Sequence, residues 1–284
     1  MATEIRVQRF AEVGDFLDAA ADFLEAREAE HNLIFGICSS LRETPERYGE
    51  PYLAVVERGD TVVAAAIQTP PFRLVLSEVD DPAAIEVLVE DMLDRELPGV
   101  TGPAEQTRAF AETWNARGGP TATLHMSERI YRLSQVRPPR PMAGRYRMAT
   151  VADRGLAIEW TEGFMRDAFG DVDPAEVAAD VDRWLARRGR TLDLWDDGAP
   201  VSLCGVGGET PNGIRIGPVY TPPALRGRGY ASALVAAVSQ AELDAGRRFC
   251  FLFTDLTNAT ANHIYQAIGY ELIRDVDAYR FARP

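Results

Sequence analysis

The chain has 284 residues, of which 46% are hydrophobic and 26% charged, a composition typical of a globular protein with room for two domains. Its formal net charge of -13 argues against nucleic acid as a partner, because a phosphate backbone requires a basic surface, and it favours a cationic substrate. The sequence contains no apolar run long enough to predict a membrane span.

The first ten residues lack the basic and then apolar pattern of a secretory signal, which predicts a cytoplasmic protein. Cys38, Cys204 and Cys250 are far apart in the sequence, which favours buried thiols over disulfides. The histidines are equally scattered, and we expect no metal site.

The first half of the chain alternates strand-like and helix-like runs. The expected strands are Ile5–Phe10, Tyr52–Glu57, Thr61–Ile67, Arg73–Glu78, Thr121–Met126 and Ile130–Leu133. The expected helices are Val13–Ala29, Leu33–Leu41, Ala83–Leu97 and Ala104–Arg117. Residues 137–144 then contain three prolines and a glycine. This predicts a linker between a domain of residues 1–136 and one of residues 145–284.

The second half shows a similar order of elements. Its expected strands are Tyr146–Val151, Thr191–Trp195, Val201–Val206, Ile214–Tyr220, Phe249–Phe253 and a short edge strand at Tyr279–Ala282. Its expected helices are Val151–Phe169, Pro174–Arg188, Gly229–Ala245 and Ala259–Ile268. The sequence therefore predicts an α/β (α+β) protein built as a divergent repeat, each domain a mixed, mostly antiparallel sheet flanked by helices.

One loop carries a candidate binding function. It joins the expected strand Ile214–Tyr220 to the following helix, and its residues are Arg226, Gly227, Arg228, Gly229, Tyr230 and Ala231. Glycines let a backbone approach phosphates closely, and the unpaired N–H groups of a helix N-terminus attract anions. The spacing matches neither a dinucleotide-binding fingerprint nor a nucleoside triphosphate loop.

A second motif lies after the next strand, where Asn258, Ala261, Ile264, Tyr265 and Gly269 occupy one helix and its end. Together the two motifs resemble the GNAT-family N-acetyltransferases, over about half of the chain. The loop matches their Arg/Gln-x-x-Gly-x-Gly/Ala signature, and the helix matches their Asn-x-x-Ala-x-x-Leu/Ile-Tyr-x-x-x-Gly-Phe/Tyr pattern.

The resemblance implies that acetyl-CoA lies where the strand Ile214–Tyr220 bulges and splays from its neighbour. Pro218 within that strand donates no ladder hydrogen bond, which fits a bulge, although a proline also marks strand ends. By the same resemblance, Pro218, Val219 and Tyr220 contact the acetyl group and the pantetheine arm. Asn258 and Asn262 are further cofactor-binding candidates, with helix capping as the other reading of Asn258.

The resemblance also implies that Tyr265 is the general acid that donates a proton to the CoA sulfur. A general base is harder to place, because the strand Ile214–Tyr220 contains no Asp or Glu. Glu209 and Asp255 are the nearest carboxylates by strand position, and deprotonation through a chain of waters is the alternative. Nearby Glu162 and Asp167 are candidates for binding a cationic substrate.

The corresponding loop of the first half reads Val79, Asp80, Asp81 and Pro82. Two carboxylates at a helix N-terminus repel a pyrophosphate, so we expect a degenerate domain without cofactor, which walls the substrate cleft or holds the halves together. The sequence predicts an N-acetyltransferase that moves an acetyl group from acetyl-CoA to a primary amine of a small molecule or peptide. The alternatives are a non-catalytic acyl-CoA-binding regulator and a scaffold with a vestigial pocket.

Overall fold

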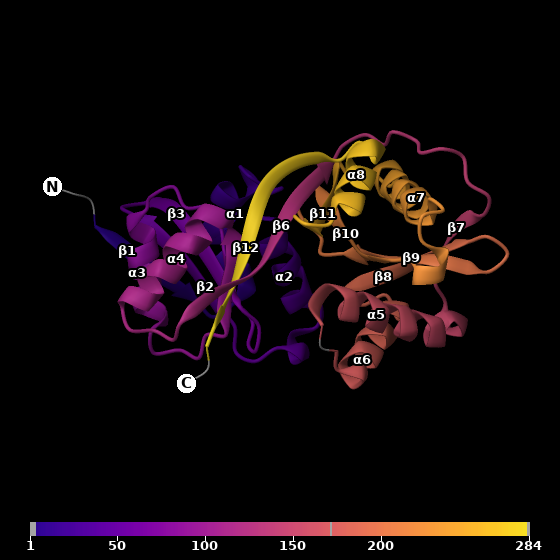
Figure 1. Ribbon diagram of the computed structural model, residues 1–284. Helices are drawn as coiled ribbons and strands as arrows, with labels where there is room; N and C mark the ends of the chain where they lie inside the picture. The colour runs from indigo at the N-terminus through magenta and orange to yellow at the C-terminus, as the bar shows by residue number, and fades with distance from the viewer. Residues whose placement is uncertain (1–3, 171, 283–284) are drawn as a thin grey trace. The chain divides into compact units, whose positions relative to one another are not determined.

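A computed structural model describes residues 4–170 and 172–282 of the chain. The chain divides into two compact units (Figure 1). The first unit contains the residues up to Ile130, Thr254–Thr257 and the residues from Ile273 on. The second contains Tyr131–Phe253 and Asn258–Leu272.

The first unit is a sheet flanked by helices. Its strands run in the order β1-β2-β3-β4-β5-β12, with bounds β1 (Ile5–Phe10), β2 (Tyr52–Arg58), β3 (Thr61–Gln68), β4 (Leu74–Leu76), β5 (Gly99–Pro103) and β12 (Glu271–Phe281). Its helices are α1 (Val13–Glu25), α2 (Asn32–Glu43), α3 (Ala83–Met92) and α4 (Ala104–Ala116). These strands pair antiparallel except β4 and β5, which are parallel.

The second unit repeats this order of elements. Its strands are β7 (Arg145–Met148), β8 (Arg190–Asp196), β9 (Pro200–Gly207), β10 (Gly213–Tyr220) and β11 (Phe249–Asp255), paired in the order β7-β8-β9-β10-β11. Its helices are α5 (Arg154–Phe169), α6 (Pro174–Leu185), α7 (Tyr230–Asp244) and α8 (Ala259–Ile268). Only β10 and β11 are parallel. The predicted repeat and the predicted fold class are confirmed.

Two cores cover the two faces of this second sheet. Leu192, Leu194 and Leu203 point toward α5 and α6. Cys204, Val206 and residues of α7 and α8 fill the other face, and Figure 1 shows α5 and α6 on one side of β8 and β9, with α7 on the other. The apolar spacing of α7 follows from this burial, because Leu234, Val235 and Val238 are within 1% of full burial.

Two predicted strands at the end of the first half form one strand. The sequence suggested separate strands at Thr121–Met126 and Ile130–Leu133, whereas β6 runs unbroken over Ala122–Leu133. Its polar middle stays extended because Ser127 Oγ donates to Asp277 (2.6 Å) and Arg129 Nε donates to Asp275 (2.9 Å) of β12. Cross-strand polar pairs thus replace the apolar side chains that usually mark a strand.

The predicted short edge strand at Tyr279–Ala282 is also wrong. β12 has 11 residues, and it lies between β5 and β6 in the sheet order. Strand β5 was not predicted, because two of its five residues are glycines and one is a proline, which are rare in strands. Both differences arise from partners distant in sequence, which no local pattern reports.

Candidate functional site

Strand β10 is irregular near its C-terminal end. Its register against β9 shifts between Ile216 and Val219, which marks a β-bulge, and its parallel pairing with β11 ends at Arg215 and Phe251. Beyond Arg215 the strand continues to Tyr220 without pairing to β11. The structure shows the bulge and the splay that the resemblance implied, with Pro218 inside the strand.

Two residues that sequence reasoning missed hold this bulge. A Cβ atom on Gly205 of β9 would lie 2.8 Å from both Gly217 O and Pro218 Cδ, so only glycine leaves room for the bulge there. Arg190 of β8 donates a hydrogen bond from Nη1 to Gly217 O. The available signal was Gly205 itself, a glycine interrupting the apolar run Val201–Val206.

The loop after β10 ends at the N-terminus of α7. Gly227 (φ 76°) and Gly229 (φ 91°) have left-handed backbone conformations, and Gly229 is the N-cap residue. No side chain of the described chain caps this helix. Its first N–H groups are therefore available to an anion, at the positive end of the helix dipole.

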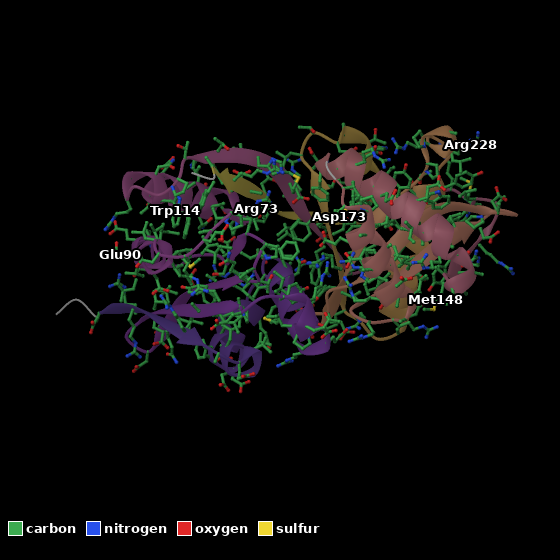
Figure 2. The ribbon with its side chains drawn as sticks, turned by 90° about the horizontal axis from the view of Figure 1, so that it is seen from below. Arg73, Glu90, Trp114, Met148, Asp173 and Arg228 are labelled. Carbon is green, nitrogen blue, oxygen red and sulfur yellow. The ribbon has the colours of Figure 1, made fainter. Side chains whose placement is uncertain are left out.

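The two arginine side chains of this loop are exposed. Arg226 Nη2 donates to Asp167 of α5 (2.6 Å), and Arg226 Nε donates to Thr221 O (2.8 Å). Arg228, labelled in Figure 2, donates a hydrogen bond from Nη2 to Ala224 O at 3.3 Å. Asp167, a candidate for binding a cationic substrate, thus contacts the loop itself.

Tyr265 of α8 is buried in the core beneath α7 and α8, with 9% of its surface exposed. Its ring lies edge to face with Tyr270, 5.9 Å between centroids. Burial raises the pKa of Tyr265 above its usual value, and the neighbouring Cys204 thiol adds to the rise. The phenol therefore stays protonated at neutral pH, as a proton donor must be.

The two asparagines of α8 make local hydrogen bonds. Asn258 caps the helix, because its Oδ1 accepts from the N–H of Ala261 at 3.0 Å. Asn262 is buried, accepts from Tyr131 Oη (2.9 Å) and donates to Asn258 O (2.9 Å). These contacts orient the start of α8, and the cofactor-binding roles of both residues stay predictions.

The two candidate bases occupy different elements. Glu209 lies in the turn between β9 and β10, at the end of β10 opposite the glycine-rich loop, and it forms an ion pair with Arg247. Asp255 is the last residue of β11, where its Oδ1 accepts from the backbone N–H of Thr257 at 2.6 Å. Both carboxylates are held by neighbours in the protein, and their roles as a base stay predictions.

A buried carboxylate that the sequence did not single out lies beneath α7. Asp193 of β8 is 3% exposed, and its Oδ1 has no hydrogen-bond partner among the described residues. Burial, helped by the negative charge of Glu242, raises its pKa to about 7, against the lowering effects of a hydrogen bond from Tyr146 and the charge of Arg187. The structure therefore contains a carboxyl group that titrates near neutral pH.

This shift predicts a pH-dependent stability. Because the pKa of Asp193 is higher in the folded chain than its ordinary 3.8, the folded state binds more protons, and stability falls as pH rises from about 4 to about 7. Over this range the free energy of unfolding should fall by up to about 4 kcal/mol, and Asp193→Asn should remove that fall. Urea unfolding of the unmodified protein and of Asp193→Asn at pH 5.5 and 8 measures the free energy of unfolding. The same pH dependence in both proteins would contradict the raised pKa of Asp193.

Comparisons with known proteins agree with this geometry. Residues 197–281 match the FR47-like protein family model, whereas no curated protein matches the chain significantly in sequence. A Drosophila protein of solved structure superposes with a TM-score of 0.68 at 14% identity, covering 97% of this chain and 98% of its own. A tandem GNAT protein from the clavulanic acid biosynthesis pathway gives 0.59 at 16% identity, covering 98% of each chain. A GNAT-family acetyltransferase from Colwellia psychrerythraea gives 0.58 at 10% identity, covering 98% of this chain and 100% of its own.

The chain has the tandem GNAT fold. This fold supports acyl transfer in general, and the match of the family model to residues 197–281 includes the loop and α8 of the second GNAT unit. The bulge, the splay and the uncapped helix all lie in that unit.

The first GNAT unit differs at the corresponding helix N-terminus. There Asp81 Oδ1 accepts from the N–H of Ala83 at 3.0 Å, and Asp81 also pairs with Arg58. Asp80 pairs with Arg27 at 2.7 Å. A carboxylate of the protein thus already occupies the N-terminus of α3, where the second unit leaves its N–H groups unpaired.

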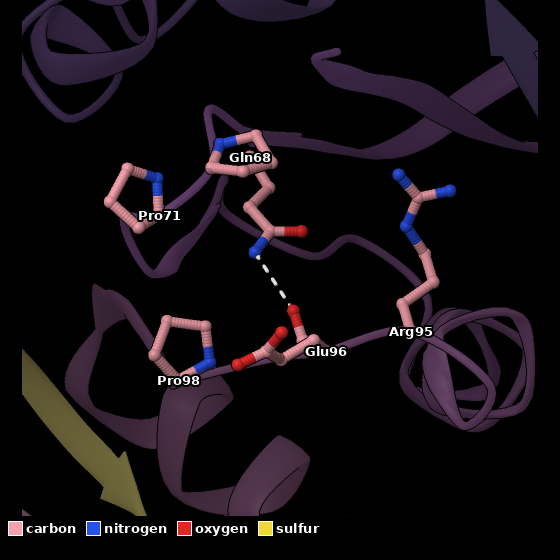
Figure 3. Close-up of a pocket in the computed structure, with 6 residues that line it drawn as sticks. Gln68, Pro71, Arg95, Glu96 and Pro98 are labelled. Carbon is pink, nitrogen blue, oxygen red and sulfur yellow. Dashed lines mark hydrogen bonds between the residues drawn. The ribbon is translucent and has the colours of Figure 1, made fainter. Parts of the chain in front are cut away.

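The first GNAT unit contains a pocket of ≈ 320 Å³ near the N-terminal ends of its parallel strands β4 and β5 (Figure 3). Its lining residues are Gln68, Pro70, Pro71, Arg95, Glu96 and Pro98. The Gln68 amide donates to Glu96 O at 3.4 Å. Half of these lining residues are prolines, and we assign the pocket no part in acyl transfer.

In residues 4–170 and 172–282, no three His, Cys, Asp or Glu side chains are grouped to hold a metal ion. Within the same ranges, none of the helices combines the length and apolar character that crossing a bilayer requires. All three cysteines are buried and not disulfide-bonded.

Proposed function

We propose that this protein is an N-acetyltransferase that moves an acetyl group from acetyl-CoA to a primary amine of a small molecule or peptide, at a site in its second unit. One observation carries the proposal: a bulged strand that splays from its neighbour leads directly into an uncapped helix N-terminus. The splay gives room for an extended arm between two strands, and the helix end suits a diphosphate.

The residues of this site fit such a ligand. The backbone N–H groups of the loop, together with the exposed guanidinium groups of Arg226 and Arg228, would hold the pyrophosphate. Arg226 currently pairs with Asp167 on the surface, 48% and 53% exposed, and such pairs contribute little free energy. A phosphate can therefore replace Asp167 at small cost.

The remaining residues would serve the acetyl end. Val219 and Tyr220, at and beyond the bulge, would present backbone groups to the acetyl carbonyl and the pantetheine arm. Acetyl-CoA supplies an activated thioester. The new C–N bond would form as the C–S bond breaks and Tyr265 donates its phenolic proton to the sulfur. The amine would release its proton to water, from which the phenolate of Tyr265 would regain one.

Release of free CoA thiol tests the proposal. The purified protein is incubated with acetyl-CoA and a panel of primary amines, and thiol is followed against a control without amine. We expect amine-dependent release. A thermal shift with CoA but no release on any amine would instead favour the acyl-CoA-binding regulator, and no thermal shift would favour the scaffold.

Glu209 gives a separate prediction about the base. Its ion pair with Arg247 and its place at the start of β10 lead us to expect that Glu209→Gln changes kcat by less than about threefold, whereas loss of a general base costs about 10²- to 10⁴-fold. Steady-state rates across pH 6 to 9 measure this. A loss of a hundredfold, with the basic limb of the pH profile removed, would make Glu209 the base.

A further inference from the structure

The pocket of the first GNAT unit is lined by charged and polar groups as well as by three prolines. Arg95 and Glu96 contribute opposite charges to it, and Gln68 contributes a carboxamide. Its volume of ≈ 320 Å³ lies at the lower end of the range of ligand pockets, which is about 300 to 1,000 Å³. The pocket therefore suits a small molecule with polar groups.

Gln68 presents a hydrogen-bond acceptor to this pocket. The residue is 1% exposed, and its Nε2 donates to Phe72 O at 3.1 Å and to Glu96 O at 3.4 Å. These two carbonyls orient the amide, whereas its Oε1 accepts no hydrogen bond from residues 4–170 and 172–282. Figure 3 shows this oxygen on the side of Arg95. Because a buried acceptor is costly to leave unpaired, the pocket favours a ligand that carries an N–H group.

Arg95 presents a guanidinium without an anionic partner in the described part of the chain. It is half-buried and lies over the ring of Tyr52, 5.1 Å from the centroid. Arg9 lies over the same ring, but it pairs with Asp91 at 2.5 Å. The Tyr52 hydroxyl also donates to Asp91, at 2.6 Å. Asp91 is thus held by two other neighbours, and the N–H donors of Arg95 are available to a ligand.

Glu96 supplies the opposite charge at the same pocket. Its carboxylate makes no ion pair or hydrogen bond with the residues that the structure describes, although it follows Arg95 directly in the sequence. Figure 3 shows the Arg95 guanidinium and the Glu96 carboxylate on different sides of the Gln68 amide. A purely anionic ligand would be repelled by Glu96, and a purely cationic one by Arg95. A ligand that carries both charges meets neither repulsion.

We propose that this pocket binds a small zwitterion, with its carboxylate on Arg95 and its ammonium on Glu96 and Gln68 Oε1. A planar guanidinium matches a carboxylate with two parallel hydrogen bonds, and an ammonium donates to several acceptors at once. Pro71 and Pro98 would contact the apolar part of the ligand. Amino acids and dipeptides share this chemistry and differ in the separation of their charges. The pocket belongs to the first unit, so this binding is separate from the acetyl transfer proposed for the second.

Calorimetric titration of the full chain without acetyl-CoA tests the proposal. The zwitterionic probes are L-alanine and L-alanyl-L-alanine, whose relative affinities distinguish an amino acid from a dipeptide. Ethylamine and propionate are the matched probes, because each keeps only one of the two charged groups of alanine. We expect at least one zwitterion to bind more tightly than both singly charged probes, by about tenfold or more, the effect of a charge-assisted hydrogen bond.

Variants then place the binding at this pocket. Arg95→Gln should weaken the affinity for the zwitterion by about ten- to a hundredfold, and Arg95→Lys should restore part of it. Glu96→Gln, at an exposed side chain whose change leaves the fold intact, should weaken it as well. The matched control is Arg117→Gln, which removes an exposed arginine of the same unit paired with Glu90 at 2.9 Å and should keep full affinity.

Three results would overturn the proposal. The first is the absence of binding heat from both zwitterions at concentrations up to about 10 mM. The second is propionate or ethylamine binding as tightly as the zwitterions. The third is unchanged affinity in both Arg95→Gln and Glu96→Gln, which would place the zwitterion elsewhere on the protein.

Discussion

Tyr265→Phe is expected to lower kcat by about 10²- to 10⁴-fold, the usual contribution of a general acid. Within residues 4–170 and 172–282 the Tyr265 hydroxyl makes no hydrogen bond, and burial keeps it protonated. Its removal should therefore leave the free energy of unfolding within about 1 kcal/mol. Affinity for CoA, measured by thermal shift or calorimetry, should be unchanged.

Tyr270→Phe is the matched control for the loss of a buried hydroxyl. The Tyr270 hydroxyl shares a hydrogen bond of 2.8 Å with Ser239, so its loss should cost about 0.5 to 1.5 kcal/mol of stability while kcat stays near that of the unmodified protein. Opposite effects of the two variants on rate and stability would identify a catalytic phenol. Unchanged turnover in Tyr265→Phe would remove Tyr265 from the mechanism.

Gly205→Ala is expected to lower kcat by about 10²-fold, because a displacement of about 1 Å at a reacting centre can cost that much. The new Cβ would lie 2.8 Å from Gly217 O and Pro218 Cδ, so the bulge must move. Overpacking of this kind also costs about 1 to 3 kcal/mol of stability. Binding at the loop should persist, because the loop lies beyond the bulge.

Gly155→Ala in α5 is the control, since a Cβ there meets nothing within 4 Å. It should raise stability by up to about 1 kcal/mol, as alanine usually does in a helix, and leave the rate unchanged. Urea unfolding and thiol release on the same preparations measure both variants. If Gly205→Ala kept full activity, the bulge would not position the reaction.

The sequence predicted the parts of the site that are contiguous in the chain. The glycine-rich loop and α8 each depend on a few neighbouring residues. Local backbone geometry and the presence or absence of a capping side chain determine how each helix begins. The bulge in β10 was implied by the family resemblance, and Pro218 fits it because proline lacks a ladder donor. The repeated order of elements was equally readable from periodicity.

The features that were missed depend on partners far away in the sequence. Strand β6 extends through its polar middle only because β12 supplies Asp275 and Asp277 about 150 residues later. Arg190 and Arg215 lie on either side of β9, where both take Gly207 as their register partner. No local sequence pattern around these positions predicts these pairings between distant strands.

The sequence by itself therefore determined the fold class, the tandem repeat and the loop that we propose binds acetyl-CoA, because each follows from local spacing and backbone chemistry. Only the tertiary structure decided that β12, near the end of the sequence, belongs to the same unit as the first strands. It also decided that Gly205 makes room for the bulge and that burial gives Asp193 a pKa of about 7. Register and burial are properties of the assembled sheet, since they arise when strands distant in sequence pair.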